Sequence, residues 1–296
     1  MMEVDPLPGT SYTWLNVGTL RKDPRVGCVE LNRPDKANAF NTGLWDEFPR
    51  AIDAMDAAAS TLGLRAVLVT GAGPNFCAGI DLQYLKDMFQ ALKQERCPGR
   101  MREQFRRHIL GMQACFSVLE ACRLPVIAAV HGCCVGGGID LITACDVRVC
   151  SEGATFCVKE VDVGIVADLG TLQRLPRIVG FGLAQDLALT ARTIGAERAL
   201  QIGLVTEVVP GGRDALLQAA CRFASALASK PPLALVGTKR VLLHARDSAA
   251  VRDGLDYVAT WNSAQLMSDD VAQVVGVMGG RGKPRAPVFA KLASKL

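Results

Sequence analysis

Two glycine-rich loops carry the residues best suited to chemistry. They read GAGPNFCAGIDL (Gly71–Leu82) and HGCCVGGGIDL (His131–Leu141), and each follows an apolar strand-like run and precedes a helix. Backbone N–H groups at a helix N-terminus have no intrahelical acceptor and carry the positive end of the helix dipole. Two such turns facing each other would offer a pair of donors to a developing oxyanion. Two ordinary tight turns would account for the glycines, but they would not explain why both loops end in the same residues, GIDL.

Acidic residues gather in and after the second loop. The two loops lack the known phosphate-binding signatures. Neither loop has the GK[ST] ending of a P-loop or the glycine spacing of a dinucleotide fingerprint. The carboxylates of this stretch are Asp140, Asp146, Glu152, Glu160, Asp162 and Asp168. An apolar pocket would keep such a carboxyl group protonated near neutral pH. We expect Asp146 and Glu152 to face solvent or cap turns, and we leave Asp162 out of the chemistry.

The composition is that of a soluble globular protein. Half of the 296 residues are hydrophobic, 21% are charged, and the net charge of +4 demands neither nucleic acid nor an anionic membrane. Several of the eleven cysteines, such as Cys28 and Cys134, lie in apolar segments, and no CxxC pair occurs. We therefore expect free thiols in a reducing compartment, with neither a disulfide framework nor a zinc site.

Strand-like and helix-like segments alternate along most of the chain. Strands are predicted near 12–20 and 26–31, and a helix near 42–59. Residues 81–122 are predicted to be mostly helical with a break at Pro98-Gly99, and a helical stretch is expected from Arg213 to about Val277. Further strands are expected at LRAVLVTG, PVIAAV, VRVCS, ATFCV and GLVTEVV. The order indicates an α/β fold with a helical C-terminal part.

One segment has the length and apolar character of a membrane span. Leu124–Cys145 is almost uncharged, but it contains four glycines, His131 and Asp140. An aspartate near a bilayer centre costs about 2.5–3.5 kcal/mol. We expect a buried strand, a loop and a buried helix here, and no membrane span.

The two ends of the sequence differ in targeting information. The N-terminal residues MMEVDPLPGTSYTW contain two acids and no apolar or arginine-rich run, which argues against a secretory or mitochondrial signal. The last three residues, Ser294, Lys295 and Leu296, spell the peroxisomal matrix signal. They follow GGRGKPRAPVFAKLA, which reads as a flexible basic tail. We expect import into a peroxisome-like organelle, glycosomes included, through the matrix import receptor.

Four motifs in consistent order resemble one known family. They are NRPDKANAFN (Asn32–Asn41), FCAGIDL (Phe76–Leu82), AAVHGCCVGGGIDL (Ala128–Leu141) and LQRLPRIVG (Leu172–Gly180). Together they resemble the signature regions of the enoyl-CoA hydratase/isomerase (crotonase) superfamily. The resemblance implies a spiral of ββα turns over residues 12–210, a helical region at 211–280 that builds homotrimers or dimers of trimers, and a tail at 281–296.

The resemblance also implies an acyl-CoA thioester as substrate and assigns its contacts. The thioester oxygen is expected between the N–H groups of Ile80 and Gly137. Lys36 and Ala37 fall where the family contacts the nucleotide end of CoA. The pantetheine and the thioester are expected along Ala78, Gly79, Ile80, Asp81 and Leu82. CoA is part of the substrate, and no metal or separate cofactor is implied. His131 is expected to be structural.

The acids after the second loop resemble one branch of this superfamily. Hydratases in the family carry glutamates at the positions of Asp140 and Glu160 and a glycine-rich loop where this chain has Asp168. The segment KEVDVGIVADLGTLQRLP instead resembles the Δ3,5-Δ2,4-dienoyl-CoA isomerase branch of fatty-acid β-oxidation, which has Asp, Glu and Asp at this spacing. The resemblance implies that Glu160 is the base at C2, Asp168 the acid at C6 and Asp140 a residue that sets their protonation or orientation.

Alternatives remain for Asp168 and for the activity. Asp168 stands just before a predicted helix, where it could be an N-cap. The alternative activities are 2-enoyl-CoA hydratase and Δ3,Δ2-enoyl-CoA isomerase. A protein that uses the same fold to bind RNA is the non-enzymatic alternative, although no dense lysine stripe supports it.

Overall fold

A seven-stranded sheet forms the centre of the protein. The computed structural model describes residues 3–92, 94–248, 250–266, 268–279 and 287–294. The strand order is β1-β2-β3-β4-β5-β7-β10. The strands are β1 (Val4–Pro6), β2 (Leu15–Leu20), β3 (Asp23–Leu31), β4 (Ala66–Gly71), β5 (Val126–Val130), β7 (Val147–Ser151) and β10 (Glu207–Val209). The first three strands pair antiparallel, and from β3 to β10 every pair is parallel.

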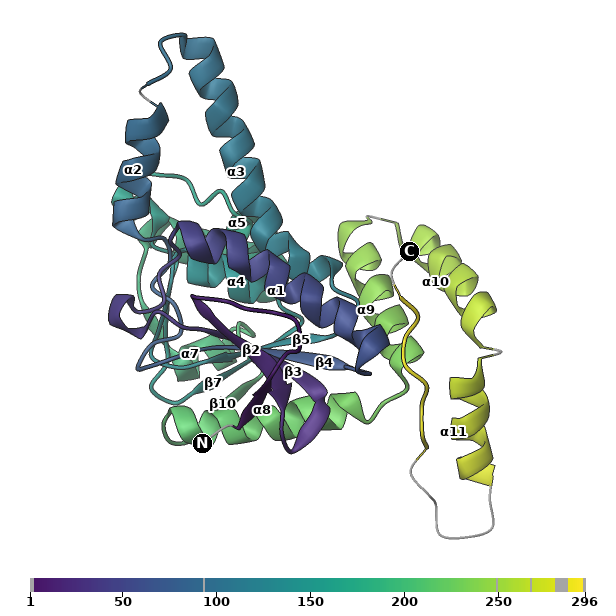
Figure 1. Cartoon of the computed structure of the whole chain (residues 1–296). Coiled ribbons are helices and arrows are strands. Elements are labelled where there is room, and N and C mark those ends of the chain that lie inside the picture. The colour runs from purple at the N-terminus through teal and green to yellow at the C-terminus, as the bar shows by residue number, and fades with distance from the viewer. Residues whose placement is uncertain (1–2, 93, 249, 267, 280–286, 295–296) are drawn as a thin grey trace.

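Helices cover both faces of this sheet. Figure 1 shows α1 (Thr42–Thr61) over one face and α8 (Arg213–Ala228) along the other. On the α1 side lie α3 (Pro98–Ala121), α4 (Gly137–Ala144) and α5 (Thr171–Val179). The helix α2 (Leu82–Leu92) and the first half of α3 project from the body as a hairpin (Figure 1). The remaining helices are α6 (Phe181–Thr190), α7 (Ala196–Gln201), α9 (Pro232–Asp247), α10 (Val251–Gln265) and α11 (Asp269–Gly279).

The central strands are apolar on both sides because each side contacts a different part of the core. Along β4, Val67 and Val69 belong to the cluster under α1 and α3, whereas Ala66 and Leu68 belong to the cluster under α8. Successive side chains of a strand point to opposite faces, so a strand buried between two helical layers reads as a continuous apolar run. The run AVLVTG is fully buried, as this arrangement requires.

Parallel pairing brings the two glycine-rich loops to the same edge of the sheet. Strand β4 pairs with β5, and the two loops leave their carboxyl ends. In open α/β sheets this edge is where ligands bind. A smaller three-stranded sheet of β6 (Cys133–Val135), β8 (Thr155–Cys157) and β9 (Ile194–Gly195) extends the second loop. A parallel bridge between Cys77 and Cys134 joins the loops directly.

Most predicted elements are present, with shifted ends and some omissions. Strand β2 begins at Leu15 rather than at residue 12, and β3 begins at Asp23. The apolar segment Leu124–Cys145 forms the expected buried strand, β5, and the expected buried helix, α4, with the short strand β6 in the part expected to be a loop. Within the described residues no helix is long and apolar enough to cross a membrane. The short strands β1, β6 and β9 were not predicted, because two or three residues give no clear periodicity.

The described end of the chain is docked on the body, which corrects the expectation of a flexible tail for Pro287–Ser294. Phe289 and Leu292 are buried, and Leu292 belongs to the main core cluster. The carbonyl of Ala293 accepts hydrogen bonds from Ser60 Oγ at 2.8 Å and from Arg123 Nη1 at 2.6 Å. Lys295 and Leu296 of the predicted targeting signal lie outside the described residues. Apolar side chains and satisfied carbonyls thus hold this arm where composition alone indicated a solvated tail.

We predict that Leu292→Ala destabilises the fold. Truncating a buried leucine costs about 2–5 kcal/mol of unfolding free energy. Val288 is 82% exposed in the same arm, and Val288→Ala should change that free energy by less than about 0.5 kcal/mol. Urea denaturation followed by circular dichroism measures both variants. Equal stability of Leu292→Ala and the wild type would mean that the arm is not docked in solution.

Candidate active site

The backbone around Ile80 is held by a bridge to Phe40, and the Ile80 N–H points away from Phe40. Phe40 and Ile80 form an isolated parallel bridge, in which Phe40 N donates to Gly79 O at 2.7 Å and Asp81 N donates to Phe40 O at 3.0 Å. The described residues contain no cis peptide bond, so the C=O and N–H of each peptide unit point in opposite directions. Because Gly79 O points toward Phe40, the Ile80 N–H of the same peptide unit points away from Phe40.

The N–H of Gly137 is freed in the same way by the start of α4. Gly136 O accepts hydrogen bonds from Ile139 N at 2.7 Å and from Asp140 N at 3.3 Å, inside the first helical turn. The Gly137 N–H belongs to the same peptide unit as that carbonyl, so it points out of the helix. Gly136 has a φ of +52°, a conformation that favours glycine.

The two donors lie next to each other with no side chain between them. A Cβ atom on Gly137 would lie 3.9 Å from Ile80 N. A Cβ on Gly79, whose φ is +91°, would lie 3.2 Å from Gly137 N and 2.8 Å from Val135 O. Glycine at position 79 is therefore required by the backbone conformation and by the close approach of the two loops. The resulting pair of N–H groups has the form of an oxyanion hole.

Asp140 is buried in the first turn of α4 and holds the start of α5. Its Oδ1 accepts a hydrogen bond from Thr171 N at 2.6 Å. The helix begins at Thr171, and its N-cap residue Gly170 has no side chain to satisfy that N–H. The interpretation of Asp168 as an N-cap is therefore wrong, because the capping carboxylate comes from another helix. Burial, the largest effect, raises the pKa of Asp140 to about 6, although the hydrogen bonds from Thr171 lower it.

Glu160 lies beside the oxyanion hole. It is the first residue of the short 3-10 helix Glu160–Val163 and is buried. A Cβ on Gly136 would lie 3.5 Å from Glu160 Oε1. Glu160 Oε2 is buried and has no hydrogen-bond partner among the described residues. Burial and then the nearby Asp140 raise the pKa of Glu160 to about 7, which suits a group that exchanges protons near neutral pH.

Asp168 completes a cluster of three carboxyl groups. It is half-buried between the buried residues Ala167 and Leu169, and burial raises its pKa. Its charge contributes to the raised pKa of both Asp140 and Glu160. Raised pKa values of this kind allow one carboxyl group to hold a proton while another is ionised. The fold thus brings the three predicted acids together.

The predicted CoA-contacting residues lie in two neighbouring segments, around Lys36 and around Ile80. Ala37 has a φ of +46°, and its carbonyl accepts a hydrogen bond from Ala78 N at 2.9 Å, so the two predicted segments are neighbours. Lys36 and Leu82 are exposed. Asp81 forms an ion pair of 2.9 Å with Arg33.

Sequence reasoning missed Arg33. This residue joins the segment that contains Lys36 and Ala37 to the first glycine-rich loop. Besides pairing with Asp81, its guanidinium donates to Ala39 O at 2.6 Å and lies over the Trp14 ring. The signal that could have indicated it is an arginine in the NRP motif with an acid directly after the glycines of the first loop. Arg33 thus contacts Ala39 and Asp81, which are the neighbours in sequence of the bridged residues Phe40 and Ile80.

Other polar residues near the site have structural partners. The expectation that Asp146 faces solvent or caps a turn needs correction. The half-buried carboxylate forms an ion pair of 2.8 Å with the buried Lys239 and accepts a hydrogen bond from Val126 N at 2.7 Å. Asp162 is exposed and pairs with Lys159. His131 Nε2 contacts Gly73 O at 3.0 Å, and burial lowers its pKa to about 4, in keeping with a structural role.

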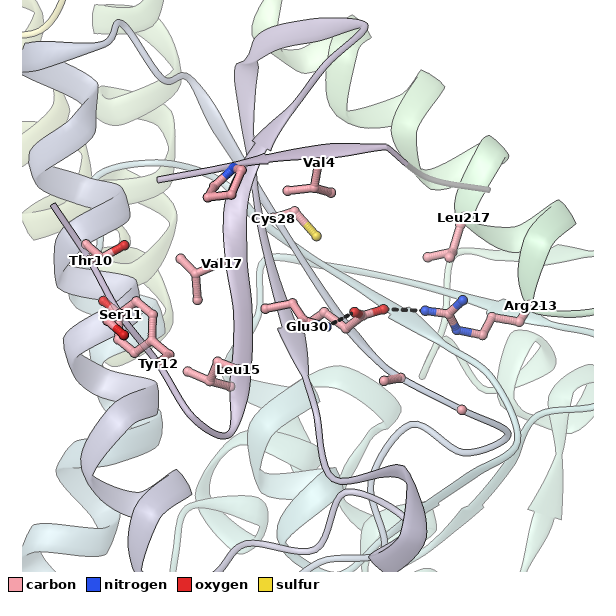
Figure 2. A pocket seen from close by; sticks show the side chains of 14 residues that line it. Val4, Thr10, Ser11, Tyr12, Leu15, Val17, Cys28, Glu30, Arg213 and Leu217 are labelled. Carbon is pink, nitrogen blue, oxygen red and sulfur yellow. Dashed lines mark hydrogen bonds and ion pairs between the residues drawn. The ribbon is translucent and has the colours of Figure 1, made fainter. Parts of the chain in front are cut away.

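A separate cavity of about 710 Å³ lies on the other side of the first loop (Figure 2). It is bounded by β1 to β3 and the start of α8, and Glu30 and Arg213 form an ion pair at one end. Arg213 Nε also donates to Gly71 O at 3.0 Å. Among the described residues that line this cavity, none belongs to the predicted site.

Comparison with known proteins assigns the fold to a family. A family model described as enoyl-CoA hydratase/isomerase matches residues 21–273. The chain belongs to this family. It is similar to an enoyl-CoA hydratase from Bacillus anthracis of known structure, with a TM-score of 0.81, 28% identity, and coverage of 95% of this chain and 100% of the other. The resemblance inferred from the four motifs is thereby confirmed, as is the α/β fold class.

Two curated family members are more similar in sequence. The peroxisomal Δ(3,5)-Δ(2,4)-dienoyl-CoA isomerase of Arabidopsis thaliana is 46% identical over 282 residues, 95% of this chain and 99% of the relative. The mitochondrial Δ(3,5)-Δ(2,4)-dienoyl-CoA isomerase of Homo sapiens is 42% identical over 288 residues, 96% of this chain and 85% of the relative.

We predict that Glu160→Gln stabilises the protein selectively at alkaline pH. Because the pKa of Glu160 rises from 4.5 to about 7 on folding, its contribution to stability is full below about pH 4.5 and is lost as the pH rises through 7. The ionised side chain is then buried at a cost on the order of 1–3 kcal/mol. The melting temperature of Glu160→Gln should exceed that of the wild type at pH 8 by more than at pH 5.

The exposed Glu152 provides the matched control. Glu152→Gln should shift the melting temperature equally at both pH values. A pH-independent effect of Glu160→Gln would contradict the raised pKa.

Proposed function

We propose that this protein is a Δ3,5-Δ2,4-dienoyl-CoA isomerase of fatty-acid β-oxidation. The observation that carries the proposal is the pair of outward-pointing N–H groups of Ile80 and Gly137 beside the buried Glu160, whose pKa is raised by its burial and by Asp140 and Asp168. The names of the two curated relatives support the same activity. The presence of Asp168 in this cluster favours the isomerase over a hydratase.

The first step is removal of a proton from C2 of a 3,5-dienoyl-CoA. The Glu160 carboxylate takes this proton, and the C–H electron pair spreads over C2, C4, C6 and the thioester oxygen. The N–H groups of Ile80 and Gly137 stabilise the oxygen as its negative charge develops. Glu160 suits this position because its carboxylate lies against Gly136, next to the donors.

The second step is delivery of a proton to C6. Asp168 gives its proton to C6, and the double bonds at C3 and C5 become double bonds at C2 and C4. The product is a 2,4-dienoyl-CoA, and no electrons are gained or lost overall, so the reaction needs no redox cofactor. Since acid and base must act on carbons four bonds apart, they must come from different segments, as Glu160 and Asp168 do.

Each turnover leaves the proton on the wrong carboxyl group. Glu160 ends protonated and Asp168 ionised, so a proton must return before the next cycle. Asp140 interacts electrostatically with both, and its own pKa is about 6. We assign Asp140 to this equilibration and to holding α5, rather than to direct contact with the substrate.

The CoA part of the substrate is proposed to bind along the two neighbouring segments that contain Lys36 and Ile80. Lys36 and Ala37 would contact the nucleotide, and Ala78 to Leu82 would flank the pantetheine. We also propose a homotrimer or a dimer of trimers. Apolar side chains exposed on the C-terminal helices, including Leu242, Val251 and Leu255, support an association surface there.

The decisive test is incubation of the purified protein with 3,5-octadienoyl-CoA. Formation of the conjugated 2,4-dienoyl chromophore is expected, with no product after hydration assays on 2-enoyl-CoA. Hydration without isomerisation would favour the hydratase alternative. Inactivity in both assays together with retention of generic RNA on a filter at physiological salt would favour the binding-protein alternative.

We predict that Asp168→Asn separates the two proton transfers. Isomerisation should fall by at least ~10²–10⁴, the contribution of a positioned proton donor. Exchange of the C2 proton with deuterated solvent needs only Glu160 and the two N–H donors, so mass spectrometry should detect it at near wild-type rate. Full isomerase activity in Asp168→Asn would end the two-carboxylate mechanism.

We further propose a peroxisomal or glycosomal location. The tripeptide Ser294-Lys295-Leu296 supports it, as does the peroxisomal name of the Arabidopsis relative, whereas the human relative is named as mitochondrial. Deleting the tripeptide should leave the isomerase rate unchanged, because it removes none of the proposed site residues. Fluorescence microscopy of a tagged protein should then show the variant in the cytosol. Import that persists without the tripeptide would refute this location signal.

A further inference from the structure

The segment that carries Asp168 has no regular secondary structure of its own. It lies between the 3-10 helix Glu160–Val163 and the start of α5 at Thr171. The residues before it, Val161 to Val166, are exposed. The direction of the Asp168 side chain must therefore be set by contacts from neighbouring elements rather than by a helix or strand.

Gln113 of α3 makes one of these contacts at Asp168 itself. Its Nε2 donates a hydrogen bond to Asp168 O at 2.6 Å, and the side chain is half-buried. The carbonyl carbon is bonded to the Cα from which the carboxyl side chain projects. Fixing this carbonyl therefore restricts the backbone torsions that aim the carboxyl group.

Arg174 of α5 holds the next residues from the same side. Its Nη1 donates to Leu169 O at 3.3 Å. Gly170 has a φ of +127°, and a Cβ there would lie 1.8 Å from Arg174 Nη1, so the guanidinium occupies the space that any side chain at this position would need. Thr171 N donates to Asp140, as described above. Consecutive backbone groups from Asp168 to Thr171 are thus fixed by three different side chains.

The guanidinium of Arg174 is itself anchored. Its Nη2 donates to Glu120 Oε2 at 2.9 Å and to Ser117 Oγ at 3.0 Å, both on α3. Glu120 also forms an ion pair with Arg246 of α9. The anchor therefore extends from the catalytic segment through α3 to the C-terminal helices.

The chemical nature of Gln113 suits a position beside carboxyl groups. An amide donates a hydrogen bond without adding charge. A lysine or arginine donor at this position would stabilise the ionised form of Asp168 and disfavour the protonated form that the proposed reaction needs. A glutamate would have no N–H to donate and would add a fourth acid to the cluster.

We propose that Gln113 is a positioning residue that aims the Asp168 carboxyl group at the far end of the dienoyl chain, with Arg174 and Glu120 holding the adjoining backbone. This inference rests on the proposed function, because it concerns the delivery of the proton to C6. It adds to the three acids a residue that touches neither the substrate nor the reacting atoms.

The test compares Gln113→Met with Gln173→Met. Methionine has nearly the length of glutamine but no N–H donor. Gln173 is exposed and lines the same cavity of about 430 Å³ as Gln113, so Gln173→Met is a matched control. Both variants and the wild type are assayed with 3,5-octadienoyl-CoA for isomerisation and, in deuterated solvent, for exchange at C2.

We expect Gln113→Met to lose isomerisation on the order of 10–100-fold while C2 exchange changes by less than about threefold, because misplacing a catalytic group by about 1 Å costs up to about 100-fold. The KM should stay near the wild-type value, since Gln113 is not among the residues proposed to contact CoA. Gln173→Met should match the wild type in both assays. If Gln113→Met does not fold, Gln113→Asn keeps the amide but is one methylene too short, and the same selective loss is expected.

Other outcomes are informative. Equal loss of exchange and isomerisation in the Gln113 variants would assign Gln113 a general structural role and overturn the inference, and so would unchanged isomerisation. A wild-type protein that does not isomerise the substrate would overturn the proposed function itself, which distinguishes the two failures.

Discussion

The hydrogen bond from the Thr171 N–H to the Asp140 carboxylate joins the two halves of the site. Asp140 belongs to α4, whose first residue, Gly137, carries one of the two N–H groups of the proposed oxyanion hole. Thr171 begins the helix that follows Asp168. One bond of 2.6 Å thus fixes the start of α4 relative to the segment that carries Asp168, the proposed proton donor. It also places a negative charge where it raises the pKa of Glu160.

The proposed oxyanion hole depends on close backbone approach rather than on side chains. Two loops from neighbouring parallel strands meet at the Cys77–Cys134 bridge, and Phe40 supports the first loop from the opposite side. Each donor is freed because the carbonyl of its own peptide unit is bonded elsewhere. The rigid frame costs no reorganisation when charge develops on the substrate, which is the property that makes such donors effective.

The burial that raises the pKa values of the three acids also costs stability. Ile139, Leu141 and Ile142 flank Asp140 in α4 and belong to the main hydrophobic core. Burial in such a core disfavours the charged form of a carboxyl group and moves its pKa toward neutrality. The large apolar core on that side of the sheet offsets the free-energy cost of burying these acids. Peripheral contacts, such as that of Leu292 in the docked arm, add to this stabilisation.

The sequence by itself determined the features that depend on local pattern. The buried run AVLVTG and the two glycine-rich loops follow from the pattern of apolar residues and from the positions of the glycines, whereas Ile80 and Gly137 were assigned as donors by the family resemblance. The grouping of Asp140, Glu160 and Asp168 followed from motif resemblance, and in the structure the charge of Asp168 contributes to the raised pKa of both Asp140 and Glu160. Their roles in catalysis stay predictions.

Only the tertiary structure decided which distant groups satisfy one another. The cap of α5 comes from Asp140, 31 positions before Thr171, although Asp168 was the capping residue that the local pattern allowed. The pairs Arg33–Asp81 and Asp146–Lys239, the contact of Gln113 with Asp168 and the docking of Leu292 are of the same kind. Local spacing specifies elements and turns, whereas a hydrogen bond between separate elements depends on how those elements pack in space.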